Sequence, residues 1–139
     1  MVLDSINKDD TELIEAATDL LKECHEPGRL VTSAAVRAES GSIYTGMGLR
    51  TPIGGTGVHA EPVAIGQAIS EGERDFRTVV AMTYADVPRD GEPRVIAACG
   101  TCRELIASYS TDADIIVLED DERIKIPVSE SLPHPAYPE

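Results

Sequence analysis

Apolar side chains recur at a helical spacing near the start of the chain, over residues 13–24. Asp9 and Asp10 precede this stripe, where the helix macrodipole favours negative charge, and Pro27-Gly28 follows it. The spacing therefore predicts a helix that ends before Pro27. Cys24 falls on the apolar stripe, and we expect it to be a small core residue.

The rest of the chain alternates between apolar runs typical of strands and segments typical of helices. This order predicts an α/β domain in which helices pack on a mixed sheet. Strands are predicted at residues 30–39, 43–49, 76–84, 114–118 and 123–128, with a turn at 40–42. Helices are predicted at residues 59–70 and 100–108, and residues 94–98 lead into the second of these. A glycine-rich loop at 51–57 and a polar loop at 85–93 connect the elements.

Length and composition fit one domain with an aliphatic core. The chain has 139 residues, 42% of them apolar, with no Trp and one Phe. A domain usually spans roughly 150 residues, and neither an internal repeat nor a linker divides this sequence. We therefore expect residues 1–139 to form a single domain.

The charge is strongly negative, and it restricts the partners. The chain has 25 acidic and 12 basic residues, which gives a formal net charge of −13. Such a chain repels the phosphates of nucleic acids and anionic lipid surfaces. We expect a small-molecule substrate and neither a nucleic-acid polymer nor a membrane as partner. The start of the chain resembles no signal peptide and no run is long enough for a membrane helix, which predicts a cytoplasmic location.

The basic residues are skewed in type, since nine are Arg and only Lys8, Lys22 and Lys125 are Lys. An acidic surface with few Lys is typical of a halophilic protein, that is, one adapted to concentrated salt. At 1 M salt charges are screened beyond ~3 Å, so the repulsion between the acidic side chains is weak. An ordinary acidic cytosolic domain is the alternative.

Two short motifs carry the candidate chemistry, and each stands at the start of a predicted helix. They are His59-Ala60-Glu61 and Cys99-Gly100-Thr101-Cys102. Cysteines three apart on a first helical turn share a face, and the helix N-terminus and Arg103 both favour their thiolate forms. Two thiolates and one imidazole suit zinc, and three protein ligands leave the fourth position open, as in catalytic sites. The motifs predict zinc held by His59, Cys99 and Cys102, with Glu61 as the acid/base residue.

The combination of His-x-Glu and Cys-x-x-Cys resembles the signature of the zinc deaminases. The chain is similar to the cytidine deaminase superfamily, in particular to the small cytidine deaminases and the blasticidin S deaminases. The resemblance covers residues 30–132 and includes Ser33-Ala34-Ala35-Val36 and Leu132-Pro133. It implies a three-layer sandwich, a five-stranded mixed sheet with helices on both faces. It also implies a homotetramer whose subunits complete one another's sites.

The resemblance assigns further roles to single residues. Glu61 would carry protons from water to the ring and to the departing ammonia, and the carbonyl of Ala60 would orient the amine. Arg103 would offset the thiolate charge, and Tyr137 would supply an aromatic wall. Ala98 replaces the proline that usually precedes the first cysteine, which alters the stiffness of this part of the substrate site.

One departure from the family pattern concerns the substrate. Nucleoside deaminases carry an Asn-x-Glu that binds the ribose, whereas Gly48-Leu49-Arg50 stands at the matching positions here. Arg50 would bind a carboxylate or phosphate if it faces the pocket, and is otherwise a solvated surface residue. We expect cytidine, deoxycytidine or a cytosine nucleoside analogue as substrate. The alternatives are a non-nucleoside amino heterocycle, a non-catalytic zinc domain, and a redox pair of Cys99 and Cys102.

Overall fold

A computed structural model describes residues 4–88 and 91–133 of the chain. Within them, the helices are α1 (Lys8–Cys24), α2 (Ala60–Ser70) and α3 (Gly100–Tyr109), with a 3-10 helix, η1 (Val128–Ser131), near the end. The strands are β1 (Asp4–Ser5), β2 (Thr32–Ala38), β3 (Ile43–Met47), β4 (Phe76–Thr83), β5 (Arg94–Ile96), β6 (Asp114–Glu119) and β7 (Glu122–Pro127). No helix in these residues combines the length and the apolar character needed to cross a membrane.

The strands form one mixed sheet in the order β1-β7-β6-β4-β2-β3, with β5 paired to β4 beside this path. β4 and β6 run parallel, and the other pairs of described strands run antiparallel. β6 pairs with β4 at Thr78 and Val79, whereas β5 pairs with it further on, at residues 81–83. The neighbour of β4 on this side therefore changes along its length, from β6 in the first half to β5 in the second. The segment after β5 leads into α3.

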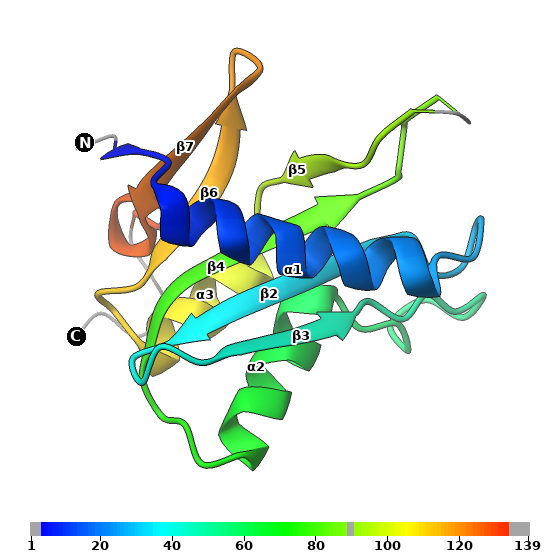
Figure 1. Ribbon diagram of the computed structural model, residues 1–139. Helices are drawn as coiled ribbons and strands as arrows, with labels where there is room; N and C mark the ends of the chain where they lie inside the picture. Colours follow the sequence, from blue (N-terminus) through cyan, green and yellow to red (C-terminus); the bar gives the residue numbers. More distant parts are fainter. Residues whose placement is uncertain (1–3, 89–90, 134–139) are drawn as a thin grey trace.

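Helices cover both faces of the sheet, with α1 on one face and α2 and α3 on the other (Figure 1). Alternation along the strands explains this arrangement, because neighbouring side chains point to opposite faces. In β2, Ala34 and Val36 pack beneath α2 and α3, while Ala35 packs beneath α1. The predicted sandwich of two helical layers around a mixed sheet is confirmed.

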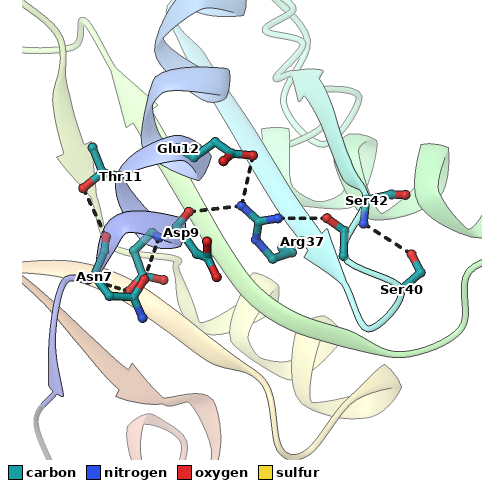
Figure 2. A network of polar contacts seen from close by, with 9 residues as sticks. Asn7, Asp9, Thr11, Glu12, Arg37, Ser40 and Ser42 are labelled. Atoms are coloured by element: carbon teal, nitrogen blue, oxygen red, sulfur yellow. Dashed lines mark hydrogen bonds and ion pairs between the residues drawn. The ribbon is translucent and has the colours of Figure 1, made fainter.

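Polar contacts fix the start of α1 against the neighbouring hairpin (Figure 2). Asn7 is the N-cap: its side chain accepts from the Asp10 amide at 2.9 Å, and Asp10 accepts from the Asn7 amide at 3.1 Å. This is a capping box, which satisfies two amide groups at the helix start. Arg37 of β2 donates to the carbonyl oxygens of Asp9 and Gly41, and so ties α1 to the β2–β3 turn.

The observed elements follow the predicted ones closely, with three differences. β1 and β5 are short strands, of two and three residues, that the apolar pattern did not indicate. The prediction that Cys24 is a core residue is wrong: it is half-buried at the last residue of α1 and belongs to neither core cluster. The reason is that the buried stripe of α1 ends at Leu21, one turn earlier.

Gly46 lets α2 approach β3 closely. A Cβ atom at this position would lie 2.6 Å from Val63 Cγ1 and 2.8 Å from the backbone nitrogen of Ala64. No side chain fits there without a shift of the helix. The glycine in β3 therefore sets the position of α2, whose first turn carries part of the candidate site.

Candidate metal centre and substrate pocket

Two helices begin at the same place in the structure, and each begins at a residue of the two motifs. His59 is the N-cap of α2 and Cys99 is the N-cap of α3. Ser, Thr, Asp and Asn are preferred at this position because their side chains bond to the first amides of the helix. Neither His59 nor Cys99 makes such a bond. Both side chains are therefore available for another role.

The side chains of His59, Cys99 and Cys102 meet at one point. His59 Nδ1 lies 3.2 Å from Cys99 Sγ and 3.3 Å from Cys102 Sγ, and all three donor atoms lie within 4.8 Å of one another. Around a tetrahedral zinc ion, nitrogen and sulfur ligands lie roughly 3.5 Å apart, given Zn–N near 2.0 Å and Zn–S near 2.3 Å. The donor types and their spacing fit zinc. Among the described residues, no fourth side chain joins this group.

A cation at this point would change the ionisation of the two nearest acidic groups, Cys102 and Glu61. Burial raises the pKa of the Cys102 thiol above its usual range, and the nearby Glu61 carboxylate raises it further. Burial likewise raises the pKa of Glu61, while its own backbone amide, the charge of His59 and a hydrogen bond with Cys102 act in the opposite direction. Burial therefore disfavours the anionic form of both groups. A bound dication reverses this balance and deprotonates a coordinating thiol.

The metal centre opens into a pocket of about 520 Å³. His59, Cys99 and Glu61 lie in its wall, whereas Cys102 is buried behind them. Glu61 is 5% exposed and stands in the first turn of α2, next to Ala60, which also lines the pocket. The pocket thus brings the carboxyl group of Glu61 and two of the three metal-binding side chains, His59 and Cys99, into contact with the same small volume, with Cys102 directly behind them.

The structure places some of the predicted substrate residues in the pocket and others away from it. Arg50 lines the pocket, as does Ala60. Ala98 does not line the pocket: it is 7% exposed and packs in the core beneath α2 and α3. The prediction that the Ala98 side chain contacts the substrate is therefore wrong. The chain turns at this point, and the neighbouring Ala97 and Cys99 face the pocket instead. Tyr137 lies outside the described residues.

Arg103 holds the segment that precedes the metal centre. Its Nε donates to the carbonyl of Ala98 at 2.7 Å, and its Nη1 donates to the carbonyl of Ser131 at 3.0 Å. These bonds connect the start of α3 to η1, close to the end of the chain. Compensation of thiolate charge by Arg103 stays a prediction, because its hydrogen bonds go to backbone oxygens.

Several pocket residues were missed by reasoning from the sequence. They are Arg29 and Val31 before β2 and Thr32 at its start, Ile96 and Ala97 between β4 and α3, and Ile53 in the glycine-rich loop with Val58 just after it. No local motif marks them. The strand order places them together, since β5 and β2 both pair with β4 near its end. One signal was present for the metal centre, namely a histidine and a cysteine at helix starts where capping residues are expected.

Comparison with known proteins identifies the family. The model of the cytidine and deoxycytidylate deaminase zinc-binding region matches residues 7–119, which include both motifs. The chain belongs to this deaminase family. It is 35% identical over 131 residues to the blasticidin-S deaminase of Bacillus cereus, covering 93% of each chain. It is 28% identical over 130 residues to a probable cytidine deaminase of Dictyostelium discoideum, covering 92% of this chain and 84% of the relative.

Solved structures show the same fold. The crystal structure of the cytidine deaminase from Bacillus anthracis superimposes with a TM-score of 0.77 at 21% identity, over 92% of this chain and 89% of the other. The cytidine deaminase from Mycobacterium tuberculosis gives a TM-score of 0.75 at 17% identity, over 95% of this chain and all of the other. The protein is thus a hydrolytic deaminase of the zinc-binding family that acts on a small molecule, and His59, Cys99 and Cys102 are placed to bind the metal.

Proposed function

We propose that this deaminase removes the amino group of a free cytosine nucleoside or cytosine nucleoside analogue and releases it as ammonia. The observation that carries the proposal is the position of Glu61. Its carboxyl group is buried in the pocket wall, in the first helical turn after His59 and in contact with Cys102. A carboxyl group beside three metal ligands is placed to move protons between a reacting water and a substrate in the pocket.

In this proposal, His59, Cys99 and Cys102 hold the zinc ion. Zinc, when bound, would lower the pKa of a water ligand to about 7 and so make hydroxide available at neutral pH. Glu61 accepts the proton that the water loses and delivers it to the ring nitrogen beside the reacting carbon. It then carries a proton to the departing amine, so that water and the aminated ring become the carbonyl product and ammonia.

The neighbouring residues orient the substrate and the ligands. The backbone carbonyl of Ala60, one residue before Glu61, accepts a hydrogen bond from the substrate amine. Arg103 fixes the turn before Cys99 through the carbonyl of Ala98, and so keeps the first turn of α3 directed at the metal. The positive ends of α2 and α3 both face this point, which favours thiolate ligands.

A nucleoside is favoured as substrate by the volume of the pocket and by the relatives. About 520 Å³ lies within the usual range for small-molecule sites. Both relatives above are named as deaminases of cytidine or of blasticidin S. A non-nucleoside amino heterocycle is the second candidate, because Gly48 offers no side chain to a ribose. The backbone also leaves little room for a side chain at this position, because a Cβ atom at Gly48 would lie 3.2 Å from the backbone nitrogen of Ala60.

We also propose that the enzyme forms a homotetramer, as the family resemblance implies. Leu49, Ile53 and Val58 are 48%, 68% and 40% exposed, and all three border the pocket. Apolar side chains grouped at the mouth of a site are typical of a surface that another molecule covers. Light scattering coupled to size-exclusion chromatography tests this proposal, with a monomeric mass as the contrary result.

The test of the proposed function is a screen for ammonia release. The zinc-loaded protein is incubated with cytidine, deoxycytidine, cytosine, blasticidin S and other amino heterocycles, in low and in high salt. We expect release from at least one cytosine nucleoside or analogue. Release from non-nucleoside heterocycles alone would replace the first candidate by the second.

A further inference from the structure

The charges in the substrate pocket are opposite in sign to those of the rest of the chain. The protein carries a formal net charge of −13, yet the residues that line the pocket include Arg29 and Arg50 and a single acid, the buried Glu61. An even spread of 25 acids over 139 residues would place about three among the lining residues. The pocket is therefore locally cationic in an acidic protein.

The backbone holds each arginine in place at the pocket. Arg50 directly follows Leu49, which exchanges two hydrogen bonds with Val58, at 2.7 and 2.9 Å. Arg29 lies in a tight turn closed by two hydrogen bonds between Glu26 and Leu30, at 2.9 and 2.8 Å. Both side chains thus start from fixed points on the pocket wall, although each belongs to a loop.

Both guanidinium groups are available to a ligand. Among the residues that the structure describes, the Arg50 side chain makes no hydrogen bond and no ion pair. Arg29 lies 3.8 Å from a carboxylate oxygen of Glu26, and these two side chains are 71% and 54% exposed. An exposed pair at this distance is weak and is readily exchanged for another anion. The remaining charged group of the wall, Glu61, is buried in the first turn of α2.

We infer that Arg29 and Arg50 bind an anionic group of the substrate, a carboxylate or a phosphate, while the amino-bearing ring lies at Glu61. The guanidinium group matches either anion because its parallel N–H groups bond to two oxygens at once. Gly48-Leu49-Arg50 then replaces recognition of a neutral ribose by recognition of charge. This inference rests on the proposed function and specifies the substrate class within it: an acidic cytosine nucleoside.

The test compares three substrates that share the ring and differ in charge. They are cytidine, cytidine 5′-monophosphate, and the cytosine nucleoside whose 5′ carbon is a carboxylate. Initial rates of ammonia release give kcat and KM for the zinc-loaded wild type and for Arg29→Gln, Arg50→Gln and the double variant. Arg123→Gln is the matched control, because this exposed arginine in β7 lies outside the pocket.

We expect the wild type to favour one or both acidic substrates over cytidine by at least about tenfold in kcat/KM, mainly through KM. Each pocket variant should lower kcat/KM for the acidic substrates more than for cytidine and so lose most of this preference, while Arg123→Gln behaves as the wild type. The acidic substrate that is preferred identifies carboxylate or phosphate as the natural group. Increasing salt should lower kcat/KM for the acidic substrates and leave cytidine unaffected.

The two proposals fail in different ways. If cytidine and the acidic substrates are deaminated equally well, or if the pocket variants reduce all three rates alike, the inference on Arg29 and Arg50 is wrong and the proposed function stands. If neither these nucleosides nor the nucleoside analogues of the screen release ammonia while the protein holds zinc, the proposed function is wrong and the inference falls with it.

Discussion

His59 Nδ1 lies 3.2 Å from Cys99 Sγ, although forty positions of sequence separate the two residues. The contact exists because α2 and α3 pack on the same face of the sheet and begin at neighbouring points. Together with the contact between His59 and Cys102, it brings the three donor side chains of the metal centre together.

Removal of a ligand should remove the metal. We expect about one zinc per chain in the wild type, and a loss of most of it in His59→Ala and in Cys99→Ser, because two remaining ligands bind zinc weakly. Zinc content is measured by elemental analysis after dialysis. Cys24→Ser is the control and should retain the metal, since Cys24 lies at the end of α1 outside the ligand group. Full zinc content in Cys99→Ser would contradict the assigned ligand set.

Glu61→Gln should separate metal binding from turnover. The amide keeps the shape of the side chain but does not carry protons, so we expect zinc content as in the wild type and a loss of kcat of at least about a hundredfold. Glu71→Gln is the control, because Glu71 is the exposed residue at the opposite end of α2. Turnover by Glu61→Gln at the wild-type rate would rule out the proposed role.

Gly46→Ala should destabilise the fold. The new methyl group would meet Val63 and the backbone of Ala64 at less than 3 Å, so α2 must move, and we expect a loss of about 1–3 kcal/mol in the free energy of unfolding. Gly66→Ala is a matched control on α2, since nothing lies within 4 Å of its Cβ position. This control should be neutral or gain up to about 1 kcal/mol from helix propensity. Urea titration measures both, and an equal effect at the two positions would refute the close approach at Gly46.

The ion pair of Asp10 and Lys125 should matter for stability. Asp10 Oδ2 lies 3.1 Å from Lys125 Nζ, and the two side chains are only 4% and 14% exposed. Asp10→Ala leaves the largely buried Lys125 side chain without this partner and also removes the capping box of α1, so we expect a loss of about 3 kcal/mol in the free energy of unfolding. Glu39→Gln breaks the exposed pair with Arg77 and should cost no more than about 1 kcal/mol. Equal unfolding midpoints for the two variants would be the contrary result.

Salt should stabilise the protein, as the halophilic hypothesis requires. Glu119, Asp120, Asp121 and Glu122 form the tip of the β6–β7 hairpin, where Glu119 and Glu122 lie directly opposite each other. Like charges in such pairs repel, and salt screens the repulsion. We expect the melting temperature to rise between about 0.1 and 2 M NaCl.

A variant of the hairpin tip separates charge from general salt effects. Asp120 and Asp121 both have positive φ angles, 50° and 64°, which Asn also adopts readily. Asp120→Asn/Asp121→Asn should therefore keep the turn, raise the melting temperature in low salt and reduce its dependence on salt. A melting temperature that falls with salt, or a variant with unchanged dependence, would count against the hypothesis.

The sequence predicted most elements to within two residues, because each has a strong local signal. The apolar stripe of α1, the apolar run of β4 and the turn at residues 40–42 depend on near neighbours only. β5 was not predicted as a strand because three residues carry no periodicity, and its partner lies across a loop in β4. Cys24 was misplaced because spacing shows which face of a helix is apolar, and not how far the sheet beneath it extends.

For the site, the sequence by itself determined which residues carry the chemistry. The types and spacing of His59, Glu61, Cys99 and Cys102 indicate zinc and an acid/base group, since ligand chemistry is a property of the side chains themselves. Only the tertiary structure decided that they meet at one place beside the pocket, that Ala98 faces the core, and that Arg29 joins Arg50 in the pocket wall. The physical reason is that these relations depend on strand order and on the packing of α2 and α3, which bring together segments that have no local contact in the chain.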